Sequence, residues 1–424
     1  MSGELLPVVA SESLRAAALE PIDPAAMEVA RAIVADVRRG GIAAARSHAI
    51  RLGDLRDDEP HWFDRSDLER ARAQLEPTVE ALLSRVAARI RSFATAQRAC
   101  LQSLQLDLGE VGSGMRGGHV VAAVERAGCY APGGRYPLPS SILMTAITAR
   151  VAGVHTVHVA SPRPSALTLA TAAIAGADGL LAMGGAQALA ALVHAKDGIG
   201  GADVVVGPGN RFVTAAKKLL AGEVGIDMLA GPSELVVLAD DSADPATIAA
   251  DLIAQAEHDP HARTILIARG APSLVARVRE QLERQLRDLP TAAIARESLA
   301  AGAATVVDST AAMIALCDHL APEHLQVMLA DAKAVAPRLR HYGGLFFGAA
   351  GAEVFGDYGL GPNHVLPTGG TARQSGGLSV FTFLRIRTFL ELDRVPPGLI
   401  EDTAALARLE GLEGHARAAE LRRE

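Results

Sequence analysis

The sequence predicts an α/β fold with two regions of parallel β-sheet, and three observations support this. Apolar residues make up 49% of the 424-residue chain but aromatic residues only 3%. Cores built from Ala, Val, Leu and Ile suit layers of helices on sheets better than an all-β sandwich. Short β-branched runs alternate with glycine turns and helical segments from Gly128 to about Asp240, and a second alternation follows it.

Residues 1 to about 125 are expected to be mainly helical. The segments 24–40 and 67–99 carry apolar residues at helical spacing, and Gly40 with Gly41 ends the first.

The next segment predicts parallel strands with helices on both faces, because each strand leads through a glycine turn into a helix. The expected strands are 154–160, 179–183 and 203–206, and the expected helices are 166–175, 186–195 and 211–222. The second alternation predicts strands at 235–240 and 264–269, helices at 245–258 and 273–287, and short strands at 305–308, 325–329 and 343–348. A helical tail from about residue 393 is too small for its own core, so it should dock on this chain or on a neighbouring subunit.

Composition argues against several classes of function. The net charge is -7 and no basic patch is interleaved with aromatics, which disfavours nucleic acid as a partner. The three cysteines are scattered, so neither a thiolate zinc site nor a disulfide framework is indicated. We find no signal peptide and no apolar run that could span a bilayer, and therefore expect a soluble cytoplasmic protein.

Two glycine turns follow predicted strands, where ligands bind in parallel sheets. Gly184–Gly185 and Gly207–Gly209 could let the backbone approach a phosphate, but neither is a G-x-G-x-x-G motif, and plain tight turns are the alternative. Gln187 and Asn210 stand just after these turns as uncharged hydrogen-bonding groups, and Asn210 could equally be a helix N-cap. Tyr130 precedes a Pro-Gly-Gly loop, where it either stacks on a planar ligand or is partly buried.

Glu323 and His324 follow Pro322 directly. The pair either presents two proton carriers to one cleft or is a helix-start glutamate followed by a surface histidine.

Four further residues form a possible metal site. Gln255 and His258, three residues apart, are expected to share one face of an alanine-rich helix. Asp357 lies in the glycine-rich stretch 355–364, which we expect to be neither helix nor central strand. His415 belongs to the tail, where it is either a ligand or a solvated histidine at a frayed end. The set of four fits Zn²⁺ first, with Mn²⁺ or Co²⁺ possible.

These residues lie in motifs that resemble the histidinol dehydrogenase family over nearly the whole chain. The resemblance is carried by GCYAPGGRYPLPSSILMTAITARVAGV, GGAQALAAL, GPGNRFVTAAKK, GIDMLAGPSELVVLAD, QAEHDP, PEHL, GDYGLGPNHVLPTGG and LEGLEGH. It implies two incomplete Rossmann-like domains, 25–127 with 235–380 for zinc and catalysis and 128–234 for NAD. It also implies an N-terminal extension, 1–24, and a C-terminal extension, 381–424, that reaches the partner in a domain-swapped homodimer.

The resemblance also implies roles for individual residues. The implied zinc ligands are Gln255, His258, Asp357 and His415. The implied catalytic pair is Glu323 and His324, and the implied NAD contacts are Tyr130, Gln187 and Asn210. The implied substrate contacts are Ser233, Gln255, His258, His324, Asp357, Glu410 and His415.

The implied reaction is the four-electron oxidation of L-histidinol to L-histidine through L-histidinaldehyde with two NAD⁺, the last step of histidine biosynthesis. His324 would act as the base, Glu323 would activate water, and Glu410 would stabilise the substrate's cationic amine, while zinc would position and polarise the substrate. Two alternatives stay open. One is oxidation of another small amino-alcohol or sulfonated diol by the same kind of enzyme. The other is a zinc hydrolase or lyase in which Glu323 activates water.

Overall fold

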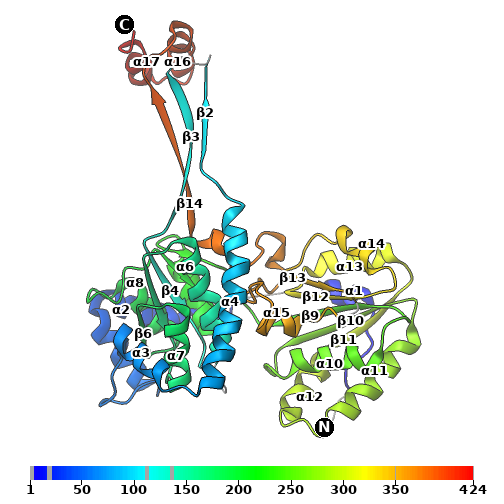
Figure 1. Ribbon diagram of the computed structural model, residues 1–424. Helices are drawn as coiled ribbons and strands as arrows, with labels where there is room; N and C mark the ends of the chain where they lie inside the picture. Colours follow the sequence, from blue (N-terminus) through cyan, green and yellow to red (C-terminus); the bar gives the residue numbers. More distant parts are fainter. Residues whose placement is uncertain (1–3, 17–21, 110–113, 134–137, 349, 424) are drawn as a thin grey trace. The chain divides into compact units, whose positions relative to one another are not determined.

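The structure is a computed structural model that describes residues 4–16, 22–109, 114–133, 138–348 and 350–423 (Figure 1). It divides into two compact units, Met1–Arg98 with Val124–Phe383 and Ala99–Ala123 with Leu384–Glu424. Among the described residues, no helix is long and apolar enough to cross a membrane.

The first sheet of the larger unit has six strands in the order β1-β6-β5-β4-β7-β8. Only the edge strand β1 runs antiparallel to its neighbour, so the predicted parallel sheet is confirmed. Its strands are β1 (Trp62–Asp64), β4 (Arg126–Tyr130), β5 (Thr156–Ala160), β6 (Gly179–Leu181), β7 (Val204–Val206) and β8 (Gly225–Ile226).

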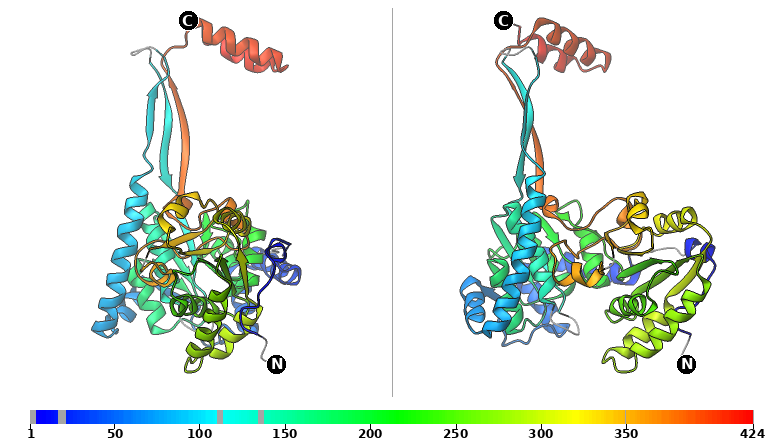
Figure 2. Two further views of the ribbon diagram at one scale, coloured as in Figure 1. Left: turned by 90° about the vertical axis from the view of Figure 1, so that its right-hand side faces the viewer. Right: turned by 45° about the vertical axis from the view of Figure 1, so that its right-hand side comes forward.

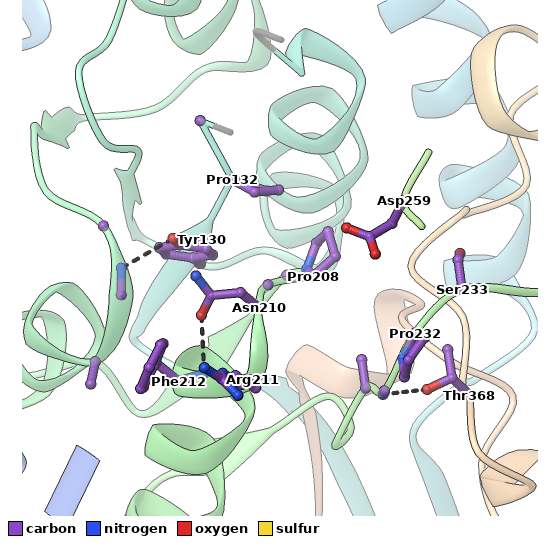
Figure 3. A pocket seen from close by; sticks show the side chains of 18 of the residues that line it. Tyr130, Pro132, Pro208, Asn210, Arg211, Phe212, Pro232, Ser233, Asp259 and Thr368 are labelled. Carbon is purple, nitrogen blue, oxygen red and sulfur yellow. Dashed lines mark hydrogen bonds between the residues drawn. The ribbon is translucent and has the colours of Figure 1, made fainter. Parts of the chain in front are cut away.

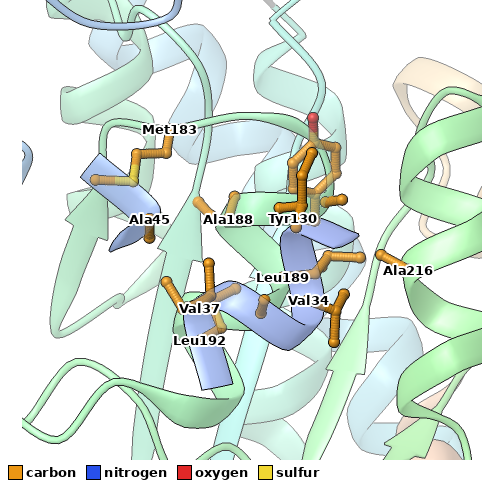
Figure 4. Packing of buried hydrophobic residues seen from close by; sticks show 14 of the residues in the cluster. Val34, Val37, Ala45, Tyr130, Met183, Ala188, Leu189, Leu192 and Ala216 are labelled. Carbon is orange, nitrogen blue, oxygen red and sulfur yellow. The ribbon is translucent and has the colours of Figure 1, made fainter. Parts of the chain in front are cut away.

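Helices cover both faces of this sheet. One face carries α2 (Pro24–Arg51), α8 (Gly185–His194) and α9 (Arg211–Leu220), whose small apolar side chains pack into one core with the strands. Figure 4 shows Val34 and Val37 of α2 beside Leu189 and Leu192 of α8. The other helices of this half are α3 (Arg65–Ala73), α4 (Pro77–Ala99), α5 (Pro139–Ile142), the π-helical η1 (Leu143–Ile147), α6 (Thr148–Ala152) and α7 (Ala166–Ala175).

The second sheet has five strands, all parallel, in the order β11-β10-β9-β12-β13. The strands are β9 (Glu234–Ala239), β10 (Arg263–Arg269), β11 (Ala303–Val307), β12 (His324–Met328) and β13 (Gly344–Phe347). One face packs on α10 (Pro245–Ala256), α11 (Pro272–Gln285) and α12 (Ala292–Ala301), and the other on α1 (Ser11–Ala16), α13 (Thr310–Leu320) and α14 (Ala332–Val335) (Figure 1). The short helices after α14 are η2 (Ala336–Arg338), α15 (Glu353–Tyr358), η3 (Thr371–Arg373) and η4 (Val380–Phe383).

Arginines occupy both ends of β10. Arg263 begins the strand and pairs with Glu234 at 3.0 Å. Arg269 ends the strand and pairs with Asp240 at 2.6 Å and with Asp331 at 2.9 Å. These ion pairs therefore lie at the carboxyl end of β10.

The amino-terminal region is mainly helical, as expected, although β1, β2 (Leu104–Asp107) and β3 (Met115–Ala123) also lie within it. However, α2 and α3 pack against α8, α9 and α7 of the six-stranded sheet, whereas we expected residues 25–127 to belong with 235–380. An amphipathic helix carries no local signal that says which sheet it will cover.

The smaller unit consists of a three-stranded antiparallel sheet and two helices. Strand β14 (Leu384–Leu392) pairs with β3 along its whole length, and β3 pairs with β2 (Figure 2). The tail is helical, as expected, and its helices α16 (Pro397–Leu409) and α17 (Glu413–Glu420) pack on each other. The sheet was not predicted from the sequence, because β2 is exposed along its length and shows no alternation of apolar and polar burial.

Candidate active site

Residues beside both sheets of the larger unit line one cavity of about 1130 Å³. The six-stranded sheet contributes the carboxyl ends of β4, β6 and β7, whereas the five-stranded sheet contributes residues just before β9 and β12. Figure 3 shows Tyr130, Asn210 and Ser233 around this space. The cavity therefore brings together turns suited to a nucleotide and the predicted catalytic segment.

Tyr130 ends β4 and is only 3% exposed. Its hydroxyl accepts a hydrogen bond from the Gly185 N–H at 3.1 Å, and burial raises its pKa to about 12. Tyr130 lines the cavity and its side chain is largely buried. Of the two possibilities that the sequence left open, burial at the end of a strand is therefore observed.

Gln187 is buried near the start of α8. Its Nε2 donates to Asp54 Oδ2 at 2.9 Å, and the same carboxylate oxygen accepts the Gly184 N–H at 3.1 Å. Its Oε1 has no hydrogen-bond partner among the described residues, which leaves one buried acceptor at the cavity wall. Asp54 was missed by sequence reasoning, because nothing local marks its contact with a turn about 130 residues away.

Asn210 is the N-cap of α9, as one sequence alternative expected. Its Oδ1 accepts the N–H groups of Phe212 at 3.0 Å and Val213 at 3.2 Å. The cap and a ligand contact are compatible, because the cap uses only the amide oxygen and the residue also lines the cavity.

The turn before Asn210 is fixed by a buried ion pair. Asp227 accepts hydrogen bonds from the Gly207 N–H at 2.7 Å and from Lys217, and Lys217 Nζ also donates to the Gly207 carbonyl. Gly207 has φ +116°, and a Cβ there would stand 1.9 Å from the Tyr130 carbonyl oxygen. No other residue fits this position, so the turn has one available shape.

Lys217→Met should destabilise the protein by about 3–5 kcal/mol, because it leaves Asp227 buried without its cation. Lys217 and Asp227 side chains are 2% and 0% exposed. Urea unfolding followed by circular dichroism measures the change. Lys218→Met, on the neighbouring residue of the same helix, is the matched control. Equal midpoints for the two variants would contradict a stabilising role for the pair.

Glu323 is held by two hydrogen bonds beside the cavity. Its Oε2 accepts from Ser233 Oγ and from the Glu234 N–H, each at 2.8 Å. The carboxyl group is buried, and desolvation raises its pKa well above the usual value. Ser233, expected to contact substrate, is thus seen to orient Glu323.

His324 is 3% exposed at the first position of β12, so the alternative of a surface histidine is wrong. Its Nδ1 lies 3.1 Å from the Glu234 carbonyl oxygen, which only an N–H can satisfy. Its Nε2 has no partner in the described part of the chain and lies 3.7 Å from Asp357 Oδ1. Burial lowers the pKa of His324 to about 3, so this tautomer offers Nε2 as a free base.

The possible metal ligands also gather here. His258, Glu353 and Asp357 each offer one ligand atom, and the three atoms lie within 4.8 Å of one another. Gln255 is completely buried, and neither atom of its amide has a hydrogen-bond partner among the residues described. An imidazole, two carboxylates and an amide oxygen suit a divalent cation, and a cation would satisfy the orphaned amide oxygen.

Two expectations about these ligands are corrected. Asp357 belongs to the helix α15, not to a loop, because Gly359 and Gly361 end the helix only after it. The helix α10 ends at Ala256, so His258 lies at a bend beyond it. Pro260 disfavours helical backbone at the preceding residue, which explains the early end. Glu353 was missed because α15 was not recognised, although its spacing of four from Asp357 is a helical signal.

Zinc affinity should fall at least about tenfold for each pH unit below about 7, because a proton competes for at least one ligand. Desolvation raises the pKa of Asp357 from 3.8 to about 7, and only the carboxylate form can bind a cation. Competition with a chromophoric chelator at about pH 6, 7 and 8 measures the dependence. An affinity that stays constant over this range would contradict the argument.

Glu410 and His415 belong to the smaller unit. Glu410 follows the last residue of α16, His415 lies in α17, and both are exposed. Their relation to the cluster in the larger unit remains a prediction from the resemblance.

Comparison with known proteins gives a consistent result. Residues 20–423 match the family model described as histidinol dehydrogenase. The chain is 47% identical to histidinol dehydrogenase of Thermus thermophilus over 306 residues, which is 72% of this chain and 74% of the relative. It is 39% identical to histidinol dehydrogenase of Ralstonia nicotianae over 411 residues, covering 95% of this chain and 92% of the relative. The crystal structure of histidinol dehydrogenase from Elizabethkingia anophelis superposes with a TM-score of 0.89 at 27% identity, covering 100% of this chain and 98% of that one.

Proposed function

Because the chain belongs to the histidinol dehydrogenase family and is therefore an NAD-dependent oxidoreductase, we propose that it oxidises L-histidinol to L-histidine with a bound zinc ion. The reaction consumes two NAD⁺ and one water and yields two NADH and three protons. L-Histidinaldehyde forms after the first hydride transfer and stays bound. The observation that carries the proposal is the free Nε2 of His324 beside a cation-binding cluster and an oriented carboxylate.

In the first half of the reaction, His324 takes the proton of the alcohol. Its Nδ1–H is held by the Glu234 carbonyl, so Nε2, which has no partner among the described residues, is left as the proton acceptor. Loss of that proton lets the alcohol carbon release a hydride to the nicotinamide. Gln255, His258 and Asp357 would hold the zinc ion, which would supply electrostatic polarisation and help to position the substrate.

In the second half, Glu323 takes a proton from the water that attacks the aldehyde. Ser233 and Glu234 hold its carboxylate at one oxygen, which leaves the other free to accept the proton. The resulting hydrate gives its hydride to the second NAD⁺, and His324 takes the second hydroxyl proton. One chain thus provides separate bases for the two halves.

The nicotinamide cofactor is proposed to bind at the wall made by Tyr130, Gln187 and Asn210. The unsatisfied Oε1 of Gln187 and the rigid Gly207 turn support this choice. The tail is proposed to reach the partner subunit of a homodimer, where Glu410 would meet the substrate's amine and His415 would complete the metal site.

The stoichiometry of NADH tests this proposal. Zinc-loaded protein should release two NADH for each L-histidinol consumed, and removal of zinc by a chelator should abolish turnover until zinc is restored. Amino-alcohols and sulfonated diols serve as the comparison substrates. No turnover of L-histidinol, or faster turnover of another alcohol, would overturn the assignment.

A further inference from the structure

Glu353 is a buried carboxylate to which the proposed reaction gives no role. It is the first residue of α15 and only 3% exposed. Asp357 follows four residues later, and residues at this spacing share one face of a helix. Both carboxylates approach His258, because one ligand atom from each of the three lies within 4.8 Å of the others.

Among the residues that the structure describes, no cationic side chain pairs with Glu353. Its Oε1 lies 3.6 Å from His324 Nδ1, but that nitrogen is already directed at the Glu234 carbonyl. Its Oε2 is buried and has no hydrogen-bond partner within the described residues. The other charged groups acting on it are the acids Asp251, Glu323 and Asp357.

A second observation points to a ligand at the same place. The helices α10 and α15 contact each other, and α10 carries Gln255, which is completely buried with both amide atoms unpartnered. Buried polar groups normally have partners, and a buried carboxylate needs a positive one. A divalent cation would satisfy the carboxylates and the amide oxygen together.

We propose that Glu353 is a ligand of the zinc ion, so that Gln255, His258, Glu353 and Asp357 form a four-donor site within one chain. The inference rests on the proposed zinc-dependent function. Two carboxylates balance the charge of one divalent cation. The ion can therefore bind before His415 of a partner tail arrives, and His415 then joins a site that already holds its metal.

Zinc dissociation constants of the full-length protein test the proposal, measured by competition with a chromophoric chelator. Glu353→Gln should weaken binding at least 100-fold, a larger loss than the roughly 10–100-fold expected for a group outside the ligand shell. His415→Ala should weaken it less than about tenfold. The matched control is Glu257→Gln, which removes the negative charge of the residue before His258. The Glu257 carboxylate accepts a hydrogen bond from Thr291 Oγ1 at 2.6 Å. Glu257→Gln should bind zinc as the wild type does.

The visible spectrum of the Co²⁺-loaded protein reports the ligands directly. Glu353→Gln should change the intensity of its d–d bands, and Glu257→Gln should not. If Glu353→Gln weakens zinc binding by an intermediate factor, the spectrum decides whether Glu353 is a ligand. An altered spectrum supports ligation by Glu353, and an unaltered spectrum overturns it. The metal-free Glu353→Gln protein should melt no lower than the wild type, since the substitution removes a buried carboxyl group that lies among other acids.

His258→Asn distinguishes failure of the proposed role of Glu353 from failure of the proposed metal site. If His258→Asn loses zinc and Glu353→Gln binds it with wild-type affinity and spectrum, only the role of Glu353 is overturned. If His258→Asn also keeps zinc, the proposed metal site itself is overturned. Complete loss of zinc from His415→Ala would overturn the claim that one chain suffices.

Discussion

Glu323→Gln should slow oxidation of L-histidinaldehyde by about 10²–10⁴-fold while slowing oxidation of L-histidinol by less than about tenfold. The amide keeps the shape of the side chain and can still accept from Ser233 Oγ and the Glu234 N–H, which are 2.8 Å from Oε2 in the wild type. It cannot take a proton from water. Only the second half of the reaction needs activated water, so the two halves should separate.

The measurement supplies alcohol and aldehyde separately and follows NADH in the first turnover. Ser233→Ala is the graded control, because it removes one of the two hydrogen bonds to Glu323 and should slow aldehyde oxidation by a smaller factor. Equal losses in both halves for Glu323→Gln would assign the residue to a shared step and contradict its role as the base for water.

His258→Asn should lose the metal and at least about 10³-fold of the activity together, because the substitution removes the imidazole ligand. His258 is exposed at a bend after α10, so the change leaves no cavity in the core. Metal content after gel filtration and kcat with L-histidinol are measured on the same preparation.

His261→Asn is the matched control, since it makes the same replacement three residues further on, at another exposed histidine. This variant should retain its metal. A His258→Asn protein with full metal content, or with full activity and no metal, would show that the ion is held or used differently.

Patterns local to the sequence predicted the two parallel sheets and several residues of the candidate site. Strand, glycine turn and helix follow one another within about 30 residues, so the order of elements around Gly184 and Gly207 was readable. Gln255 stood out because a buried amide on an alanine-rich helix needs a reason. Glu323 and His324 stood out because two proton carriers are adjacent in the chain.

Features that depend on distant partners could not be predicted in this way. Asp54 stabilises the Gly184 turn from the bend that follows α2, and Lys217 meets Asp227 only after the chain has folded back. Glu353 was not identified from the sequence, because the glycines that follow Asp357 suggested a loop. In the structure these glycines only end the helix α15. The proposed ligand role of His415 depends on a second chain, and contacts between chains leave no local pattern in the sequence.

The two arginines of β10 have a consequence for protein engineering. Arg263 anchors Glu234 beside the reacting groups, whereas Arg269 lies at the far end of a seven-residue strand. At roughly 3.3 Å per residue the two ends are about 20 Å apart, more than twice the screening length of about 8 Å in physiological salt. We therefore expect changes of charge around Arg269 to leave turnover unaltered, whereas changes of charge around Arg263 should lower it.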